Sequence, residues 1–170
     1  VYDCFAGGKG LNLGNERFPY TTCFVQIVNE LDGLFHTNIL ATSQLEYKHL
    51  MQQFNKALTN ASMLANEQGN KLIIAIDAID NAVDGANHAH VNSSDSFVPL
   101  LWKIEIPENC IVIVSSRTEN IDGLDIACEY QGFAIKGFTP KETADYILHY
   151  WEEADDNLLD HIYKRTNGNP

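Results

Sequence analysis

The sequence predicts an α/β fold in which helices cover both faces of a parallel β-sheet, so that the fold has three layers. Two unbroken apolar runs, at 72–76 and 110–114, have the length and the lack of alternation of strands that are buried on both faces. Weaker strand-like runs lie at 1–5 and 130–135. Helical patterns separate most of these runs, and such alternation favours a parallel sheet with right-handed crossovers.

The composition is typical of a globular protein with one well-buried core: 45% of the 170 residues are hydrophobic and 20% are charged. The net charge of −12 argues against direct nucleic-acid binding by this chain. No run approaches the roughly 20 apolar residues of a membrane span and no secretory leader is visible, so we expect a cytoplasmic location and no membrane partner. No C-x-x-C pair occurs, which disfavours a zinc site, and we expect four reduced thiols: Cys4, Cys23, Cys110 and Cys128.

Two amphipathic helices are predicted between the first strand and the second. One begins at Thr21 and ends before Gly33. The other begins at a capping box formed by Ser43 and Glu46 and ends at Gly69. The second strand is followed by an expected polar loop at 83–95 and then by a short helix.

The last part of the chain is predicted to be helical. Thr139, Pro140 and Glu142 supply the cap, the first-turn proline and the capping-box glutamate of one helix. A final helix begins near Asp156, and Gly168 is its candidate C-terminal cap. We therefore divide the chain into an α/β domain at 1–136 and the start of a helical lid or small helical domain at 137–170.

Polar residues suited to a binding site follow two of the strands. Asp77 ends the run at 72–76, and Asp80 follows three residues later. Open parallel sheets bind ligands at the carboxyl ends of their strands, and Mg²⁺ takes one or two carboxylates, waters and phosphate oxygens as ligands. The sequence therefore predicts a magnesium ligand at Asp77. An aspartate that only caps the next helix or turn is the alternative.

Arg117 follows the strand at 110–114, with Ser116 before it. An arginine is a permanent cation whose planar set of donors suits phosphate oxygens, so a phosphate contact is one interpretation. A surface salt bridge with Glu119 or Asp122 is the other.

Five short motifs occur in order along the chain: YDCFAGG at 2–8, IDAIDNA at 76–82, SSRTE at 115–119, GFTPKETA at 137–144 and TNGNP at 166–170. Together they resemble the STAND class of P-loop NTPases, the NACHT-like signal-transduction ATPases, in a bacterial-type version. The resemblance spans nearly the whole chain. Each motif alone is weak, but five in order are fairly specific.

The resemblance implies a role for each matched residue. Asp77 matches the Walker B aspartate that holds magnesium. Asp80 matches the second acidic residue of that motif, which helps to position the attacking water. Arg117, with Ser116 before it, matches the sensor-1 arginine that reaches the γ-phosphate. Pro170 matches the proline of the G-x-P motif, which packs near the adenine.

The same resemblance implies a function that uses ATP and magnesium as cofactors. The chain would be part of a nucleotide-driven signal-transduction switch, for example in bacterial antiviral defence. Its partners would be the nucleotide, other protomers of the same protein on activation, and effector and sensor domains elsewhere in the full chain. The alternative is a non-catalytic interaction or regulatory module that retains the NTPase fold.

Two departures from the family pattern bear on activity. Asn81 stands where the family has its catalytic glutamate, and an amide cannot act as a base. The glycine-rich stretch at 7–10 does not have the Walker A spacing G-x-x-x-x-G-K-S/T. We therefore expect a fragment of a longer protein, whose central Walker A strand lies between the strands that end at Ser115 and near Ile135. This piece alone is predicted to be inactive as an ATPase.

Overall fold

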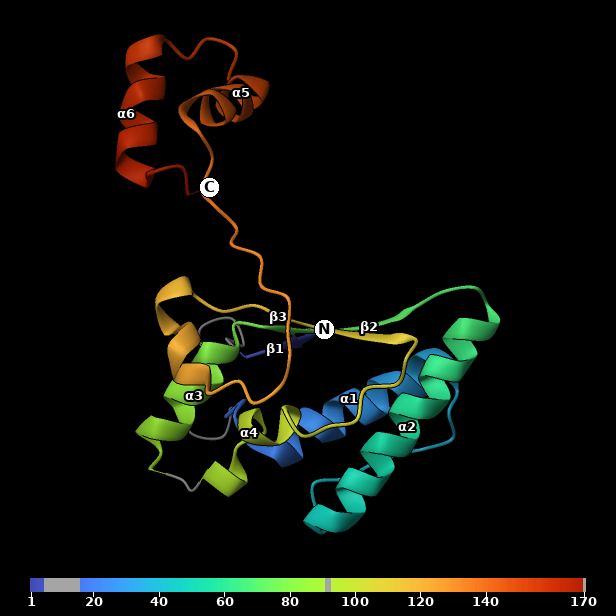
Figure 1. Cartoon of the computed structure of the whole chain (residues 1–170). Helices are drawn as coiled ribbons and strands as arrows, with labels where there is room; N and C mark the ends of the chain where they lie inside the picture. Colours follow the sequence, from blue (N-terminus) through green and yellow to red (C-terminus); the bar gives the residue numbers. More distant parts are fainter. Residues whose placement is uncertain (5–15, 91–92, 170) are drawn as a thin grey trace. The chain divides into compact units, whose positions relative to one another are not determined.

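The computed structural model describes residues 1–4, 16–90 and 93–169 (Figure 1). The chain forms two compact units, Val1–Glu129 and Tyr130–Pro170. The sequence indicates the corresponding boundary between residues 136 and 137. The glycine-rich stretch at 7–10 and Pro170, for which the resemblance implies an adenine contact, lie outside the described residues.

The first unit is a mixed α/β structure built on a three-stranded parallel sheet. The strands β1 (Tyr2–Asp3), β2 (Leu72–Asp77) and β3 (Cys110–Val114) lie in that order. In the central strand, Ile76 pairs with β1 on one side and with β3 on the other. The predicted α/β class, with a parallel sheet around two apolar strands, is therefore confirmed.

The fourth strand predicted at 130–135 is not formed. This stretch has neither helix nor strand, and the side chains of Tyr130, Phe133 and Ile135 are between 64% and 96% exposed. Apolar and aromatic residues give the stretch the composition of a strand, but a strand also needs a partner for its backbone groups. None of the strands in the described part of the chain supplies that partner.

Two long helices, α1 (Tyr20–Phe35) and α2 (Tyr47–Glu67), pack together on one face of the sheet (Figure 1). The capping box predicted at the start of the second helix is wrong. Ser43 lies in a turn in which the Leu45 N–H donates to the Thr42 carbonyl over 3.2 Å. The chain is thus still turning at the position expected to cap the helix, and α2 begins after this turn with no side-chain cap.

Aromatic side chains form the centre of the core between these two helices and the sheet. Phe24 of α1 is fully buried, and its ring centroid lies 4.7 Å from that of Phe54 on α2 and 6.5 Å from that of Phe97. Tyr2 of β1 meets Phe97 edge to face at 5.6 Å. Three of the four thiols are also buried, as small apolar side chains are: Cys4, Cys23 and Cys110.

The helices of the first unit leave one face of the sheet uncovered. Because crossovers between parallel strands are right-handed, strands that lie side by side in sequence order have their connecting helices on the same face. The opposite face carries Ile73, Ile111 and Ile113, which are between 40% and 57% exposed. Within its described residues this unit therefore has two layers, and the predicted third layer is not among them.

Between β2 and β3 the chain forms α3 (Ile79–His88), the 3₁₀ turn η2 (Ser93–Asp95) and α4 (Val98–Leu101). The polar loop predicted at 83–95 is therefore wrong over its first half. A second 3₁₀ segment, η3 (Thr118–Leu124), follows β3. The helix α3 buries only a narrow apolar face, which has too few large side chains to produce the helical pattern that identifies α1 and α2. This face is made of residues three positions apart: Ile79, Ala82 and Gly85.

The second unit contains two helices, α5 (Pro140–Tyr150) and α6 (Asp156–Thr166), and both predicted helix starts are confirmed. The chain that enters α5 contacts the chain that leaves α6, because the Phe138 N–H donates to the Gly168 carbonyl over 2.7 Å. Gly168 has a φ of +76°, and a Cβ there would lie 2.1 Å from the Phe138 oxygen, so only glycine fits. None of the helices in the described ranges has the length and apolar character needed to cross a membrane.

Candidate functional site

The carboxyl ends of β2 and β3 bring the IDAID and SSR motifs together. The register of the two strands makes Asp77 and Ser115 neighbours at the same edge of the sheet. The Ser115 hydroxyl donates to Oδ1 of Asp77 over 2.5 Å and accepts from the Ala78 N–H over 2.8 Å. The Ser115 carbonyl accepts from the Ile79 N–H over 2.9 Å. One serine thus holds the whole turn from β2 into α3.

This turn contains backbone strain. Ala78 has a φ of +53°, in the left-handed region that is unfavourable for a residue with a Cβ. Such a conformation costs on the order of 1 kcal/mol and persists where surrounding contacts hold it, which here are the bonds from Ser115. The sharp turn starts α3 immediately after the strand, so that Asp80 falls in the first turn of the helix while Asp77 stays exposed at the strand end.

Asp80 is a buried carboxylate with two hydrogen-bond donors. Its residue is 3% exposed, and its Oδ2 accepts from Nε of Arg117 over 2.5 Å and from Nδ2 of Asn120 over 2.8 Å. Burial alone would raise the pKa of this carboxyl group. The hydrogen bonds from Asn120 and Arg117, with the positive charge of Arg117, outweigh burial and hold the pKa below its ordinary value of 3.8. Asp80 is therefore ionised at neutral pH.

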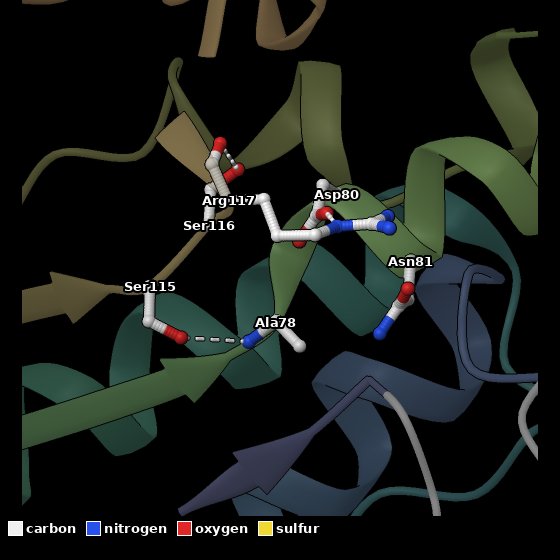
Figure 2. A pocket seen from close by; sticks show the side chains of 6 residues that line it. All are labelled: Ala78, Asp80, Asn81, Ser115, Ser116 and Arg117. Carbon is white, nitrogen blue, oxygen red and sulfur yellow. Dashed lines mark hydrogen bonds and ion pairs between the residues drawn. The ribbon is translucent and has the colours of Figure 1, made fainter. Parts of the chain in front are cut away.

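Arg117 binds a second carboxylate on the same helix. Its Nη2 donates to Oδ2 of Asp84 over 3.2 Å, and residues 80 and 84 share a face because they are one helical turn apart. The hydrogen bond and the charge of Asp80, with a contribution from Asp84, raise the pKa of Arg117 above its ordinary value. Figure 2 shows the arginine side chain extending from the chain that follows β3 across the first turn of α3. The structure shows a salt bridge, which is one of the two interpretations of Arg117. Its partners are Asp80 and Asp84 and not Glu119 or Asp122.

A hollow of about 400 Å³ lies beside these groups (Figure 2). The Ser116 hydroxyl does not donate into it, because it donates to the Arg117 carbonyl over 3.1 Å. Asn81, at the position of the family's glutamate, is part of the wall. The lining residues come from the β2–α3 turn and from the chain that follows β3: Ala78, Asp80, Asn81, Ser115, Ser116 and Arg117.

Four of the five residues for which the resemblance implies a role therefore lie at one edge of the sheet: Asp77, Asp80, Ser116 and Arg117. Three further residues of the network have no role in the site that the sequence predicts. Ser115 could have been found from the register, because it directly follows the strand beside Asp77. Asp84 requires the helical spacing of α3, and Asn120 requires the 3₁₀ turns that follow Arg117.

The residues at this edge are compatible with a magnesium ion, although they do not form a complete metal site. In the described part of the chain no three or more histidine, cysteine, aspartate or glutamate residues are grouped as metal ligands. Asp77 is exposed, and with the Ser115 hydroxyl it offers hard oxygen atoms of the type that Mg²⁺ binds together with waters and phosphate oxygens.

Comparison with known proteins does not identify this chain. No protein-family model matches it, and no curated protein matches it. The STAND resemblance and the roles that it implies for particular residues therefore stay predictions. These residues are Asp77, Asp80, Ser116, Arg117 and Pro170.

Proposed function

We propose that this chain is part of a nucleotide-driven switch of the STAND type, which binds ATP and magnesium at the carboxyl edge of the sheet. One observation carries the proposal: adjacent parallel strands lead into Asp77 and, three residues past Val114, into Arg117. Asp77 is a carboxylate suited to a metal ion, and Arg117 is a permanent cation suited to phosphate. Both thus lie at the edge where parallel sheets bind ligands.

The β3 edge of the sheet and the uncovered face beside it also support this proposal. Among the described strands β3 is an edge strand, and the face that carries Ile111 and Ile113 has no helix of its own unit over it. One further strand beside β3 that precedes β1 in the chain would reverse the direction in which the sheet grows, and the helix that connects it to β1 would cover the open face. Ligands bind in open α/β sheets at such a reversal, which here would lie next to Ser115.

In this proposal each group at the edge has a defined task. Asp77 and the Ser115 hydroxyl would hold magnesium, which when bound neutralises phosphate charge. Arg117 would contact the terminal phosphate. The sequence contains no Walker A motif, so the phosphate-binding loop would have to come from outside these 170 residues. Because Asn81 cannot act as a base, signalling would depend more on nucleotide binding and exchange than on rapid hydrolysis.

A second candidate is a non-catalytic interaction module with the same fold. The contacts of Arg117 favour it, because two carboxylates of the protein bind the guanidinium. The two candidates differ in what Asp77 does. In a switch it binds magnesium, whereas in the module it only takes part in the turn that Ser115 holds.

The test replaces Asp77 with asparagine in the longer protein that the switch requires. Titration with a fluorescent ATP analogue in the presence of magnesium should show affinity about tenfold lower or worse for Asp77→Asn, because a metal contact is lost. The matched control is Glu108→Gln, which removes the same charge from an exposed residue just before β3, at the other end of the strand. Equal affinity of wild type and Asp77→Asn would contradict the switch and favour the module.

A further inference from the structure

The two carboxylates that hold Arg117 differ in burial and in contact distance. The Asp80 side chain is 4% exposed and accepts from Nε over 2.5 Å. The Asp84 side chain is 47% exposed and accepts from Nη2 over 3.2 Å. An exposed ion pair contributes little to stability, whereas removal of one partner of a buried pair is far more costly. Asp84 is therefore the contact that an incoming group can replace.

The geometry of the guanidinium makes that replacement specific. An arginine has five N–H donors, and its two terminal nitrogens can bind two oxygens of one phosphate side by side. Within the described residues the hydrogen bonds of the Arg117 side chain use Nε, toward Asp80, and Nη2, toward Asp84. Each terminal nitrogen carries two N–H groups, so a phosphate that binds both terminal nitrogens from the hollow would share Nη2 with the Asp84 carboxylate. The two anions would then compete for the same positive charge.

We propose that Asp84 competes with phosphate for the terminal nitrogens of Arg117. Asp80 and Asn120 meanwhile keep the Nε side of the guanidinium in place. Phosphate binding then weakens the contact of Asp84 and leaves the inner contacts intact. The inference rests on the proposed function in taking phosphate as the incoming anion.

The consequence is a link between the site and the second turn of α3. With Asp84 bound to Arg117, this turn is tied to the chain that follows β3. When phosphate replaces Asp84, the first turn of α3 stays attached through Asp80, whereas the second turn loses its side-chain contact with the chain that follows β3. The negative charge of Asp84 also lowers the affinity of Arg117 for any incoming anion.

The test uses nuclear magnetic resonance of the arginine side chains in the 170-residue chain. The chain has three arginines, Arg17, Arg117 and Arg165, so their Nε–H signals are few, and loss of one signal in Arg117→Lys assigns it. The probe is inorganic pyrophosphate with magnesium, added to wild type, Asp84→Asn and the charge-matched control Glu108→Gln. Asp84 is exposed, so its replacement leaves the core intact.

We expect half-saturation of the Arg117 signal at a pyrophosphate concentration about 1.4- to 5-fold lower in Asp84→Asn than in wild type, which is the contribution of an exposed pair converted to affinity. Glu108→Gln should match wild type within that lower bound. Equal half-saturation in Asp84→Asn and Glu108→Gln would overturn the competition, and so would an Arg117 signal that pyrophosphate does not move even in Asp84→Asn.

The outcomes separate this inference from the proposed function. Competition by Asp84 together with no effect of Asp77→Asn on ATP affinity would leave the role of Asp84 and remove the nucleotide switch. Loss of ATP affinity in Asp77→Asn together with no effect of Asp84→Asn would leave the switch and remove the competitor.

Discussion

The first unit is held together by burial, whereas the second is held together by local hydrogen bonds. In the first unit Phe24, Phe54 and Phe97 are almost or entirely inaccessible, and the ring of Phe24 packs against both of the others. Among the described residues of the second unit only Thr143 and Gly168 are buried. Five of its aromatic residues are more than half exposed: Tyr130, Phe133, Tyr146, Tyr150 and Trp151.

This difference indicates which substitutions should destabilise each unit. A unit of about 40 residues buries too small a fraction of its surface to be stable by apolar burial alone. The second unit relies on contacts at its helix ends instead: Thr139 with Glu142, Asp155 with Leu158, and Phe138 with Gly168. Core substitutions should therefore dominate in the first unit and cap substitutions in the second.

The largest expected effect is that of Phe24→Ala. Truncation of a fully buried phenylalanine costs about 3–5 kcal/mol, because apolar contacts are lost and a cavity remains. Urea unfolding followed by the fluorescence of Trp102, in a Trp151→Phe background that leaves no other tryptophan, reports on the first unit alone. The control Phe133→Ala, at a residue that is 80% exposed, should stay within about 0.5 kcal/mol. Similar unfolding midpoints for the two variants would contradict the conclusion that burial holds the first unit together.

An intermediate effect is expected for Asp80→Asn, which tests the polar network of the first unit. Loss of hydrogen bonds to a charged group should lower stability by about 1.5–3 kcal/mol at neutral pH. The same Trp102 signal suits this test, because its Nε1 donates to the Leu124 carbonyl of η3 over 3.2 Å. Asp84→Asn, which removes an exposed contact, should cost no more than about 1 kcal/mol.

The pH dependence of this effect follows from the lowered pKa of Asp80. A carboxyl group with a lower pKa in the folded state than in the unfolded state stabilises the fold above its unfolded pKa. That contribution is lost as the pH falls below the ordinary value of 3.8 and through the folded pKa. The stability difference between wild type and Asp80→Asn should therefore be constant above about pH 5 and shrink below 3.8. A difference that grows in acid would exclude Asp80 as the source.

The sequence predicts those features of the fold that depend on neighbouring residues alone. The strand at 110–114 is predicted correctly because an unbroken apolar run is visible without knowledge of its partner. The start of α5 is predicted correctly because Thr139, Pro140 and Glu142 all lie within one turn. By contrast, the strand expected at 130–135 required a partner elsewhere, which no local pattern can guarantee.

The candidate site is predictable to the same extent. The strand-end positions of Asp77 and Arg117 are visible because each residue follows an apolar run. The position of Asp84 beside Asp80 is not visible in the sequence, because the sequence predicts a loop over this part of α3. Only in a helix do residues four positions apart lie on the same face. Ser115 required the register of β2 against β3, which depends on packing of the whole sheet.

The smallest expected effect in absolute terms, that of Thr139→Ala, tests the second unit. The Thr139 hydroxyl accepts from the Glu142 N–H over 3.3 Å, and the Glu142 carboxylate accepts from the Thr139 N–H over 2.8 Å. Loss of such a cap costs about 1 kcal/mol, or about fivefold in an opening equilibrium. Amide hydrogen exchange of α5 should accelerate by that factor, while the amides of β3 in the first unit keep their rates.

The control Thr139→Ser keeps the hydroxyl and should leave exchange in α5 close to wild type. Phe24→Ala should have the opposite effect: amide hydrogen exchange should accelerate in β3, while exchange in α5 stays close to wild type. If Thr139→Ala leaves the exchange of α5 unchanged, the caps do not limit the stability of the second unit. Its exposed aromatic residues, Tyr146, Tyr150 and Trp151, would then have to be covered by something that contributes more than one cap does.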